Sequence, residues 1–302
     1  MRLPSIAAQL ARGFSMGAAD IVPGVSGGTV ALVLGIYERL IRNIREGAGA
    51  LRRLVTWRPD ELAASLRRIE WTWLIALLAG ILVAVAALAS LLEGLLDDHP
   101  IQMAGLFLGL VIGAVVISWR LLDRVDAATI AVVVLAAAAV FLLLGLRTDT
   151  TVDETAAEVV TEPIWAFFLA GAIAICAMIL PGISGSFILV LLGMYTEVLG
   201  AVNDRDFLVL AVFALGCVVG LALFSTLLSW SLAHHHHWVM AGLIGLMLGS
   251  TRVLWPWPGG VETTTLAWPS DPVAVPIVLA VLGFAAVIVV EWVARRVAAE
   301  RA

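Results

Sequence analysis

The hydrophobic positions of this chain fall into long uncharged runs, separated by short segments that carry most of the charge. A helix needs about 20 hydrophobic residues to cross the hydrocarbon core of a bilayer. Runs of that length predict single crossings at 71–92, 101–119, 127–146 and 272–290. The run 207–251 is too long for one helix, so it predicts two crossings divided at the histidines 234–237.

Two further uncharged stretches, 21–37 and 163–196, are each interrupted by Pro-Gly followed by Ser-Gly. Proline within a helix removes a backbone donor and frees a carbonyl group, and glycine lets the chain turn. Unsatisfied backbone groups are tolerated at membrane depth only inside the protein or beside a water-filled cavity. The two stretches therefore predict interrupted helices around a polar cavity.

The two interrupted stretches resemble each other in sequence. The segment 23–28 (PGVSGG) aligns with 181–186 (PGISGS) at an offset of 158 residues, and the same offset aligns Gly35 with Gly193. A weaker similarity joins 109–114 to 245–250. A repeat of this length indicates a duplication of half the chain, not a solenoid.

The number of crossings between the two copies decides their relative direction. If each interrupted stretch is a re-entrant hairpin, three crossings separate the copies, which then enter the membrane from opposite faces. If each stretch crosses once, the copies are parallel, and the Arg-rich segments on either side of the first stretch lie on opposite faces. The Arg distribution favours the hairpin. We expect an all-α polytopic membrane protein with an inverted-topology repeat, each half having one re-entrant broken-helix hairpin and three transmembrane helices.

The duplication predicts a single integral membrane domain made of two halves. The first repeat spans 1–150, with its hairpin at 5–41 and an interfacial basic region at 42–70. The second repeat spans 151–302, with its hairpin at 163–200. Alternating spans place 15 Arg inside and three outside, so both termini are expected in the cytoplasm of a multi-pass cell-membrane protein. The region 42–70 either sets this topology or collects anionic headgroups.

Composition narrows the class of protein. Hydrophobic residues make up 62% of the chain and charged residues 14%, against about 45–50% and about 25% in soluble domains. This excludes a water-soluble globule, and a net charge of -5 argues against nucleic-acid binding. All 18 basic residues are Arg, which excludes a lysine nucleophile or Schiff base. No metal is expected, because four adjacent histidines on a helix cannot all face one metal. No cofactor is expected either.

Candidate substrate-binding residues come from the two interruptions. The second arm of each stretch is expected to start a helix just after Ser-Gly, and its free N–H groups suit an anion, above all a phosphate. Serine and threonine hydroxyls can add donors. The candidates are Asp20, Pro23, Gly24, Ser26, Gly27, Gly28, Thr29 and Tyr37 in the first copy, and Pro181, Gly182, Ser184, Gly185, Ser186 and Tyr195 in the second.

Charged residues near these stretches are candidates for coupling or gating. A carboxylate within a hydrophobic segment marks a functional site by default, so Asp20 could carry a proton, bind a cation, pair with Arg12 or merely cap a helix. The second copy has Met178 at this position. Glu38 and Glu197 are either interfacial or line the exits. Arg252, one of the few external basic residues, could meet a phosphate on the outer face.

The sequence 16–29 (MGAADIVPGVSGGT), continuing to Gly35-Ile36-Tyr37-Glu38, resembles the signature of prokaryotic polyprenyl-phosphate (undecaprenyl-phosphate) translocases, formerly a family of unknown function. The second copy and the segment 249–257 are also similar to that family, so the resemblance covers nearly the whole chain. It implies a flippase that returns the lipid carrier phosphate from the outer to the inner leaflet for reuse in cell-envelope glycan synthesis. The histidine run and the lack of Lys depart from the family pattern.

Other functions remain open at this point. A secondary transporter of small anions or solutes fits the same helix starts, and a proton or sodium ion could couple either transport. The segment Gly182-Ile183-Ser184-Gly185 superficially matches intramembrane serine proteases, but the histidines lie near predicted membrane ends, whereas a nucleophile needs a base within about 2.6–3.2 Å. No constellation of basic residues suggests a lipid phosphatase, so an enzyme is not expected. Glycines 105, 109 and 113 would permit a homodimer.

Overall fold

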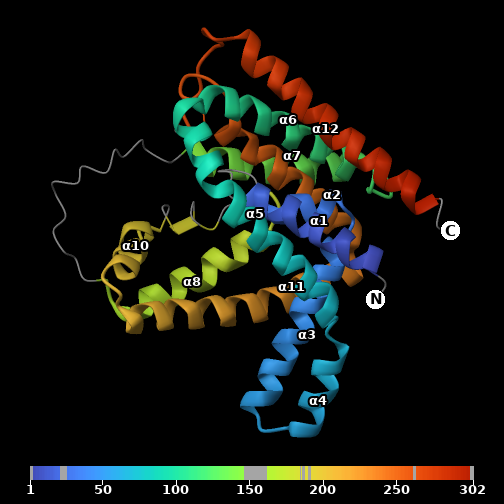
Figure 1. Cartoon of the computed structure of the whole chain (residues 1–302), viewed down its shortest axis with the longest axis vertical. Helices are drawn as coiled ribbons and strands as arrows, with labels where there is room; N and C mark the ends of the chain where they lie inside the picture. Colours follow the sequence, from blue (N-terminus) through green and yellow to red (C-terminus); the bar gives the residue numbers. More distant parts are fainter. Residues whose placement is uncertain are drawn as a thin grey trace.

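The computed structural model describes residues 3–20, 26–145, 162–183, 185, 188–189, 192–260 and 263–299. Within these ranges the protein is all-helical (Figure 1). The helices are α1 (Leu3–Asp20), α2 (Gly27–Val33), α3 (Tyr37–Val55), α4 (Pro59–Arg68), α5 (Trp71–Asp98), α6 (Pro100–Trp119), α7 (Ala127–Gly145), α8 (Ile164–Ile179), α10 (Tyr195–Asn203), α11 (Phe207–Ser250), the 3-10 helix η1 (Thr251–Leu254) and α12 (Ala274–Ala299).

Within the described ranges, five helices are long and apolar enough to cross a membrane, namely α5, α6, α7, α11 and α12. They coincide with the runs predicted from the sequence. Large hydrophobic side chains on these helices point outward, among them Leu135 and Leu223, each 69% exposed. Outward apolar surface on this scale suits lipid and not water. The protein is a multi-pass membrane protein.

The 44-residue helix α11 bends where the sequence predicts a division. His235 leaves the helical conformation, with φ -134° and ψ 37°. The bend separates α11 into a first part ending at the histidines and a second part running to Ser250. The predicted pair of crossings is thus one kinked helix with no intervening loop.

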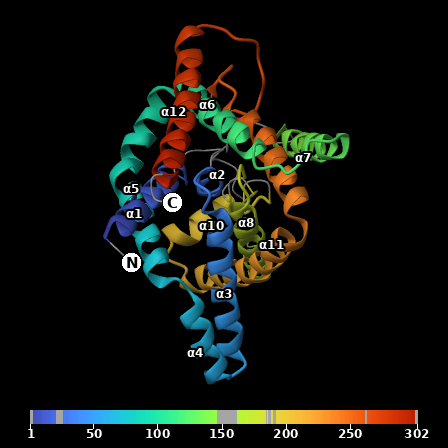
Figure 2. The same cartoon turned by 90° about the vertical axis from the view of Figure 1, so that its right-hand side faces the viewer.

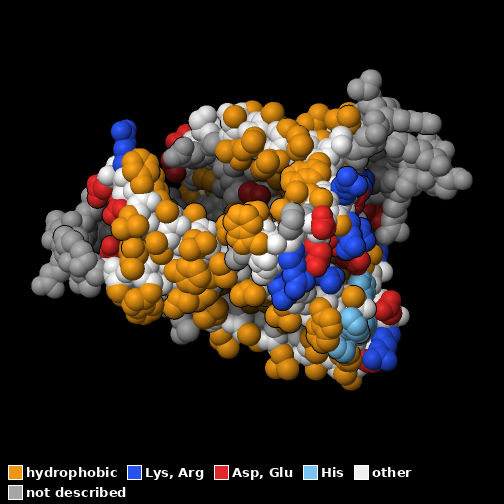
Figure 3. Space-filling model, turned by 90° about the horizontal axis from the view of Figure 1, so that it is seen from below, with side chains coloured by type: hydrophobic (Ala, Val, Ile, Leu, Met, Phe, Trp, Pro, Cys, Tyr) orange, Lys and Arg blue, Asp and Glu red, His pale blue; other side chains and the backbone are white. Residues whose placement is uncertain are grey.

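Helices α3 and α4 project together away from the other helices (Figures 1 and 2). They contain the predicted basic region 42–70, and α3 continues from Tyr37 to Val55 without a break at residue 41, where the first hairpin was predicted to end. Seen from their projecting side, Arg, acidic and His side chains gather in one area, and hydrophobic side chains cover much of the rest (Figure 3). From this side, the charged side chains therefore lie mostly together with the histidines of α11 (Figure 3).

Two of the helix pairs join a span from the first half of the chain to a span from the second half. α1 packs on α5, and α8 packs on the first part of α11. Beyond these pairs, α6 packs on α12, and α7 packs on the second part of α11, where Gly245 lies against Val133. The second span of each half therefore packs against the third span of the other half.

Matched glycines set the closeness of two of these helix pairs. A Cβ at Gly13 of α1 would collide with the carbonyl oxygen of Leu77 in α5. Likewise, a Cβ at Gly171 of α8 would collide with the carbonyl oxygen of Phe213 in α11. Gly171 lies 158 residues after Gly13, the offset that relates the two interruptions. Small residues that let backbones approach are a common device of helix packing in membranes.

Candidate functional site

The first interruption lies between α1 and α2. Ser26 is the N-cap of α2, and its side chain accepts a hydrogen bond from the Thr29 backbone N–H. Asp20, the last residue of α1, places its Oδ1 2.5 Å from the Gly27 backbone nitrogen, which donates to it. A Cβ at Gly27 would lie 2.6 Å from Asp20 Oδ2, so glycine is needed for this approach. An internal carboxylate therefore occupies the helix start; Pro23 and Gly24 lie outside the described residues.

The second interruption follows the end of α8 at Ile179. Pro181 is fully buried, and Gly182 turns the chain in the left-handed region with φ +85°. A Cβ at Gly185 would lie 3.6 Å from the Sδ of Met178. Met178 therefore contacts Gly185 in the second copy as Asp20 contacts Gly27 in the first. The difference is that the Met178 side chain is uncharged. Ser184 and Ser186 lie outside the described residues.

The two interruptions contact each other. Ser26 Oγ accepts a hydrogen bond from the Gly182 backbone N–H at 3.3 Å. The Tyr37 hydroxyl donates to the carbonyl oxygen of Ile179 at 3.1 Å, and a Cβ at Gly28 would lie 3.0 Å from that same oxygen. We call this contact the junction, defined by Ser26, Gly28, Tyr37, Ile179 and Gly182. Ser26 was expected as a hydroxyl donor to substrate; its oxygen also accepts hydrogen bonds from both copies of the motif.

The turns that follow the interruptions have the same backbone conformation in both copies. Gly35 and Gly193 have φ +64° and +68°. The tyrosines that follow them differ, because Tyr37 is only 2% exposed whereas Tyr195 is 41% exposed. The structure therefore brings Tyr37 to the junction and leaves Tyr195 on the surface. A buried tyrosine hydroxyl needs a hydrogen-bond partner, which Ile179 supplies only for Tyr37.

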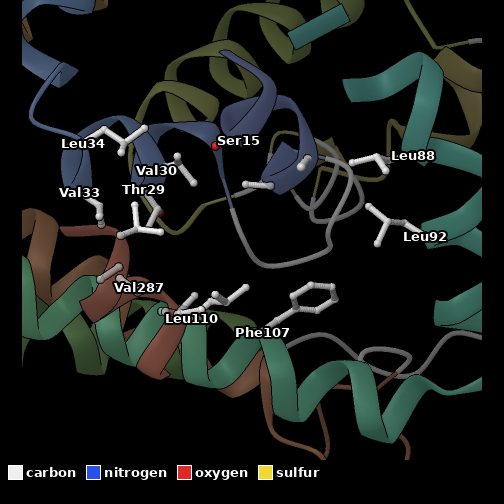
Figure 4. Close-up of a pocket in the computed structure, with 16 residues that line it drawn as sticks. Ser15, Thr29, Val30, Val33, Leu34, Leu88, Leu92, Phe107, Leu110 and Val287 are labelled. Carbon is white, nitrogen blue, oxygen red and sulfur yellow. The ribbon is translucent and has the colours of Figure 1, made fainter. Parts of the chain in front are cut away.

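An apolar cavity of about 330 Å³ adjoins the first interruption (Figure 4). Ser15 and Thr29 are the polar residues among those that line it, and the lining comes from α1, α2, α5, α6 and α12. We call it the α2 cavity; its lining includes Val30, Val33, Leu88, Leu92, Phe107 and Val287. Its walls suit a hydrocarbon segment, and its volume is at the small end of the roughly 300–1,000 Å³ of ligand pockets.

The predicted pairing of Arg12 with Asp20 is not present among the described residues. Arg12 Nη1 donates to Gln9 Oε1 at 3.2 Å. Arg39 of α3 forms an ion pair with Glu70 and lies 4.7 Å from the centre of the Trp73 ring. The hydrogen bond from Arg39 lowers the pKa of Glu70 below its usual range. This ion pair joins α3 to the start of α5.

The histidines at the bend of α11 bond to two other helices. His236 Nε2 lies 2.9 Å from Glu38 Oε1, at the start of α3. His237 Nε2 lies 2.8 Å from the hydroxyl of Thr129, whose backbone N–H and hydroxyl both donate to Asp126 at the start of α7. These bonds lower the pKa of Asp126. Glu38 was expected either to be interfacial or to line an exit, and these partners were not predicted, although Asp126 three residues before Thr129 is a recognisable N-cap signal.

The remaining two charged candidates each belong to a helix outside the interruptions. Glu197 is half-buried in the first turn of α10. Arg252 of η1 donates from Nε to the Thr264 carbonyl oxygen at 3.0 Å and from Nη1 to the Phe141 carbonyl oxygen at 3.4 Å. Neither residue is one of the five that define the junction, although Ser250 and Val253, which flank Arg252 in sequence, lie against Gly182 and Ile183 of the second interruption.

Known proteins resemble this chain over most of its length. A polyprenyl-phosphate transporter of Vibrio cholerae serotype O1 is 41% identical over 258 residues, covering 85% of this chain and 78% of the relative. A polyprenyl-phosphate transporter of Staphylococcus aureus is 31% identical over 282 residues, covering 90% of this chain and 92% of the relative. No solved structure matches the chain. A family model described as undecaprenyl phosphate translocase-like matches residues 16–269, and the chain belongs to that family.

Proposed function

We propose that this protein is a flippase that carries a polyprenyl phosphate across the cytoplasmic membrane, from the outer to the inner leaflet, for reuse in cell-envelope synthesis. The observation that carries the proposal is the junction, where two interrupted helices contact each other through Ser26 and Gly182 inside a multi-pass membrane protein. Transporters commonly build their substrate sites from such pairs of discontinuous helices. The family membership supplies the class of lipid.

We further propose that the two halves have inverted topology. The matched glycine contacts of α1–α5 and α8–α11, and the exchanged packing of the second and third spans, support it. The turns at Gly35 and Gly193, which have nearly the same φ, support the same relation between the segments that follow the two interruptions. In this arrangement the hairpin with Asp20 opens to the cytoplasm and the hairpin with Gly182 opens to the outside.

The phosphate is proposed to bind at the second interruption. At the first interruption Asp20 already accepts from Gly27, and its negative charge would repel a phosphate in a medium of low polarity. At the matched position Met178 carries no charge. Asp20 is then the candidate coupling residue, releasing the Gly27 amide when it takes up a proton or a sodium ion. The difference between the two copies gives each a separate role.

The prenyl chain is proposed to use the α2 cavity for the units next to the phosphate. The cavity adjoins the junction through Thr29, and its other walls are almost entirely apolar. Its volume of about 330 Å³ holds only part of a long chain. The remainder of the prenyl chain would stay among the lipid tails of the bilayer. Its apolar surface then never enters water, so moving it between leaflets carries no hydrophobic cost.

The transport proposal is tested with the full chain in phosphatidylcholine–phosphatidylglycerol vesicles. A fluorescent polyprenyl phosphate is followed by leaflet-specific quenching, and protein-dependent exchange between leaflets is expected. Release of inorganic phosphate from the same lipid would instead indicate a phosphatase, and sulfate flux without lipid exchange would indicate a small-anion transporter. Either result without lipid movement contradicts the proposal.

The topology is tested by labelling single cysteines in a background in which Cys176 and Cys217 are changed to Ala. Cysteines at Glu162 and Asn203, which flank the second interruption, should both react from outside the cell. A cysteine at Thr56, between α3 and α4, should react only from the cytoplasm. Opposite accessibility of positions 162 and 203 would mean that the second stretch crosses the membrane.

A further inference from the structure

A second cavity lies beside η1 and the middle of α6. Its volume is about 560 Å³. Its lining comes from α6, α7, η1 and the segment that precedes α12. We call it the Arg252 cavity; it is lined by Leu108, Ile112, Phe141, Thr251, Arg252, Trp255, Leu266, Ala267 and Trp268.

Arg252 is the charged residue of this lining, and its charge is not neutralised by an ion pair with any described residue. The guanidinium is held in place by the carbonyl oxygens of Thr264 and Phe141 and lies 4.7 Å from the centre of the Phe141 ring. Among the described residues these bonds use two of its five N–H donors, and the other three have no acceptor there. A Cβ at Gly145 would lie 2.6 Å from its Cζ, so the end of α7 leaves room for the group.

The rest of the lining is aromatic and aliphatic. Trp255 donates its Nε1 proton to the Ala267 carbonyl oxygen, which fixes its ring at the cavity wall. Trp268 is 91% exposed and Leu266 is 46% exposed. Tryptophans with one apolar and one polar neighbourhood are typical of the membrane–water interface. A cation beside hydrocarbon walls suits an amphiphile with an anionic head and an apolar chain.

We propose that the Arg252 cavity is a receiving site for the monophosphate headgroup of a prenyl lipid, separate from the junction. The proposal rests on the proposed function, whose topology places η1 at the outer face. A headgroup monophosphate accepts charge-assisted hydrogen bonds from the free Arg252 donors. The first prenyl units lie against Trp255, Ile112 and Leu266. A free inorganic phosphate would leave these apolar walls in contact with water, and a neutral lipid would leave the cation without a partner.

The position of α6 connects this site to the α2 cavity. Leu108 and Ile112 line the Arg252 cavity, whereas Phe107, Leu110 and Val111 line the α2 cavity. The two cavities therefore flank one helix at the same level along its axis. A lipid received at Arg252 needs to pass this single helix to bring its chain beside the junction.

The test uses photo-crosslinking of the full chain in detergent micelles with a diazirine analogue of farnesyl phosphate. Peptide mapping should find label within 251–268. Arg252→Gln should reduce that label about tenfold or more, the scale expected for a lost hydrogen bond to a charged group. Arg252→Lys should retain part of it. Trp268→Ala, which changes a fully exposed side chain, should reduce it severalfold without affecting folding.

Three comparisons decide the ligand chemistry. Unlabelled farnesyl phosphate should compete for the 251–268 label, and the diazirine analogue of farnesol should label this segment poorly. Competition by inorganic phosphate as strong as that by farnesyl phosphate would overturn the lipid assignment. Equal label in Arg252→Gln and the unmodified chain would overturn the site. If label at 251–268 depends on Arg252 but no lipid exchange occurs in vesicles, the receiving site stands and the transport proposal fails.

Discussion

The Ser26 hydroxyl oxygen accepts a hydrogen bond from the Gly182 backbone N–H across 156 positions of the chain. The same oxygen accepts from Thr29 at the start of α2. One small polar side chain thus satisfies donors released by both interruptions, as buried backbone groups at membrane depth require. The serine of the first motif is a structural link between the copies before any substrate is present.

Replacing Ser26 should therefore weaken the junction. Ser26→Ala removes an N-cap, which typically costs about 1 kcal/mol, and leaves the Gly182 N–H without its acceptor. We expect a lower midpoint of thermal unfolding in detergent and slower lipid exchange. Thr226→Ala is the control, because the side chain of the exposed Thr226 donates to Ala222 in its own helix and to no other described residue. Equal midpoints for the two variants would contradict the bridging role.

Gly182 and Gly193 allow backbone strain to be separated from packing. Both have positive φ, so Ala at either position costs roughly 1–2 kcal/mol. A Cβ at Gly182 would also lie 2.9 Å from Met247 Cα, whereas a Cβ at Gly193 would have no described residue within 4 Å apart from its two chain neighbours. Gly182→Ala should destabilise more, by about a further 1–3 kcal/mol for overpacking. Similar unfolding midpoints for both variants would show that α11 does not press on this turn.

Asp20→Asn tests the charge of the first interruption separately from its shape. The amide oxygen of Asn can still accept from the Gly27 N–H, so folding should be largely retained. If the carboxylate carries the coupling ion, lipid exchange should fall at least about tenfold, or roughly 1.4 kcal/mol in the barrier. Asp60→Asn, in the exposed first turn of α4, is the matched control. Normal exchange by Asp20→Asn in the presence of an ion gradient would remove the coupling role.

The spans and the interruptions could be predicted from the sequence because both depend on local chemistry. Runs without charge fix α5, α6, α7 and α12, and the histidines at 234–237 fix the bend of α11. Proline and glycine mark the interruptions for the same reason, since their effect on the backbone does not depend on neighbours. The repeat offset aligns Gly35 with Gly193, and both have a positive φ, +64° and +68°.

Contacts between segments that are distant in the sequence could not be predicted from the sequence in this way. The sequence shows Asp20 near a helix start but not that it occupies the Gly27 amide, because that requires the path of the chain between them. Tyr37 and Tyr195 were both candidates for the substrate site, yet among the described residues only Tyr37 has a partner across the junction. Arg252 looked like a free external charge, whereas carbonyl groups from α7 and the following segment orient it. Tertiary packing decides each of these differences.

The Arg39–Glu70 ion pair should make stability depend on acid pH. Its hydrogen bond lowers the pKa of Glu70 in the folded protein below the usual 4.5. The unfolded chain therefore binds the proton more readily, and the stabilisation is present above pH 4.5 and is lost as pH falls through the lowered pKa. Both side chains are about one-third exposed, so the effect should not exceed about 1 kcal/mol.

The measurement compares unfolding midpoints between pH 6 and pH 3 for the unmodified chain and Glu70→Gln. The unmodified chain should lose more stability over this interval, because the variant has no carboxylate to protonate at the start of α5. Asp60→Asn corrects for removal of a negative charge elsewhere on the α3–α4 projection. If the unfolding midpoints of the unmodified chain and Glu70→Gln change with pH in parallel, the ion pair does not hold α3 against α5. Packing of Arg39 on the Trp73 ring would then hold α3 in place alone.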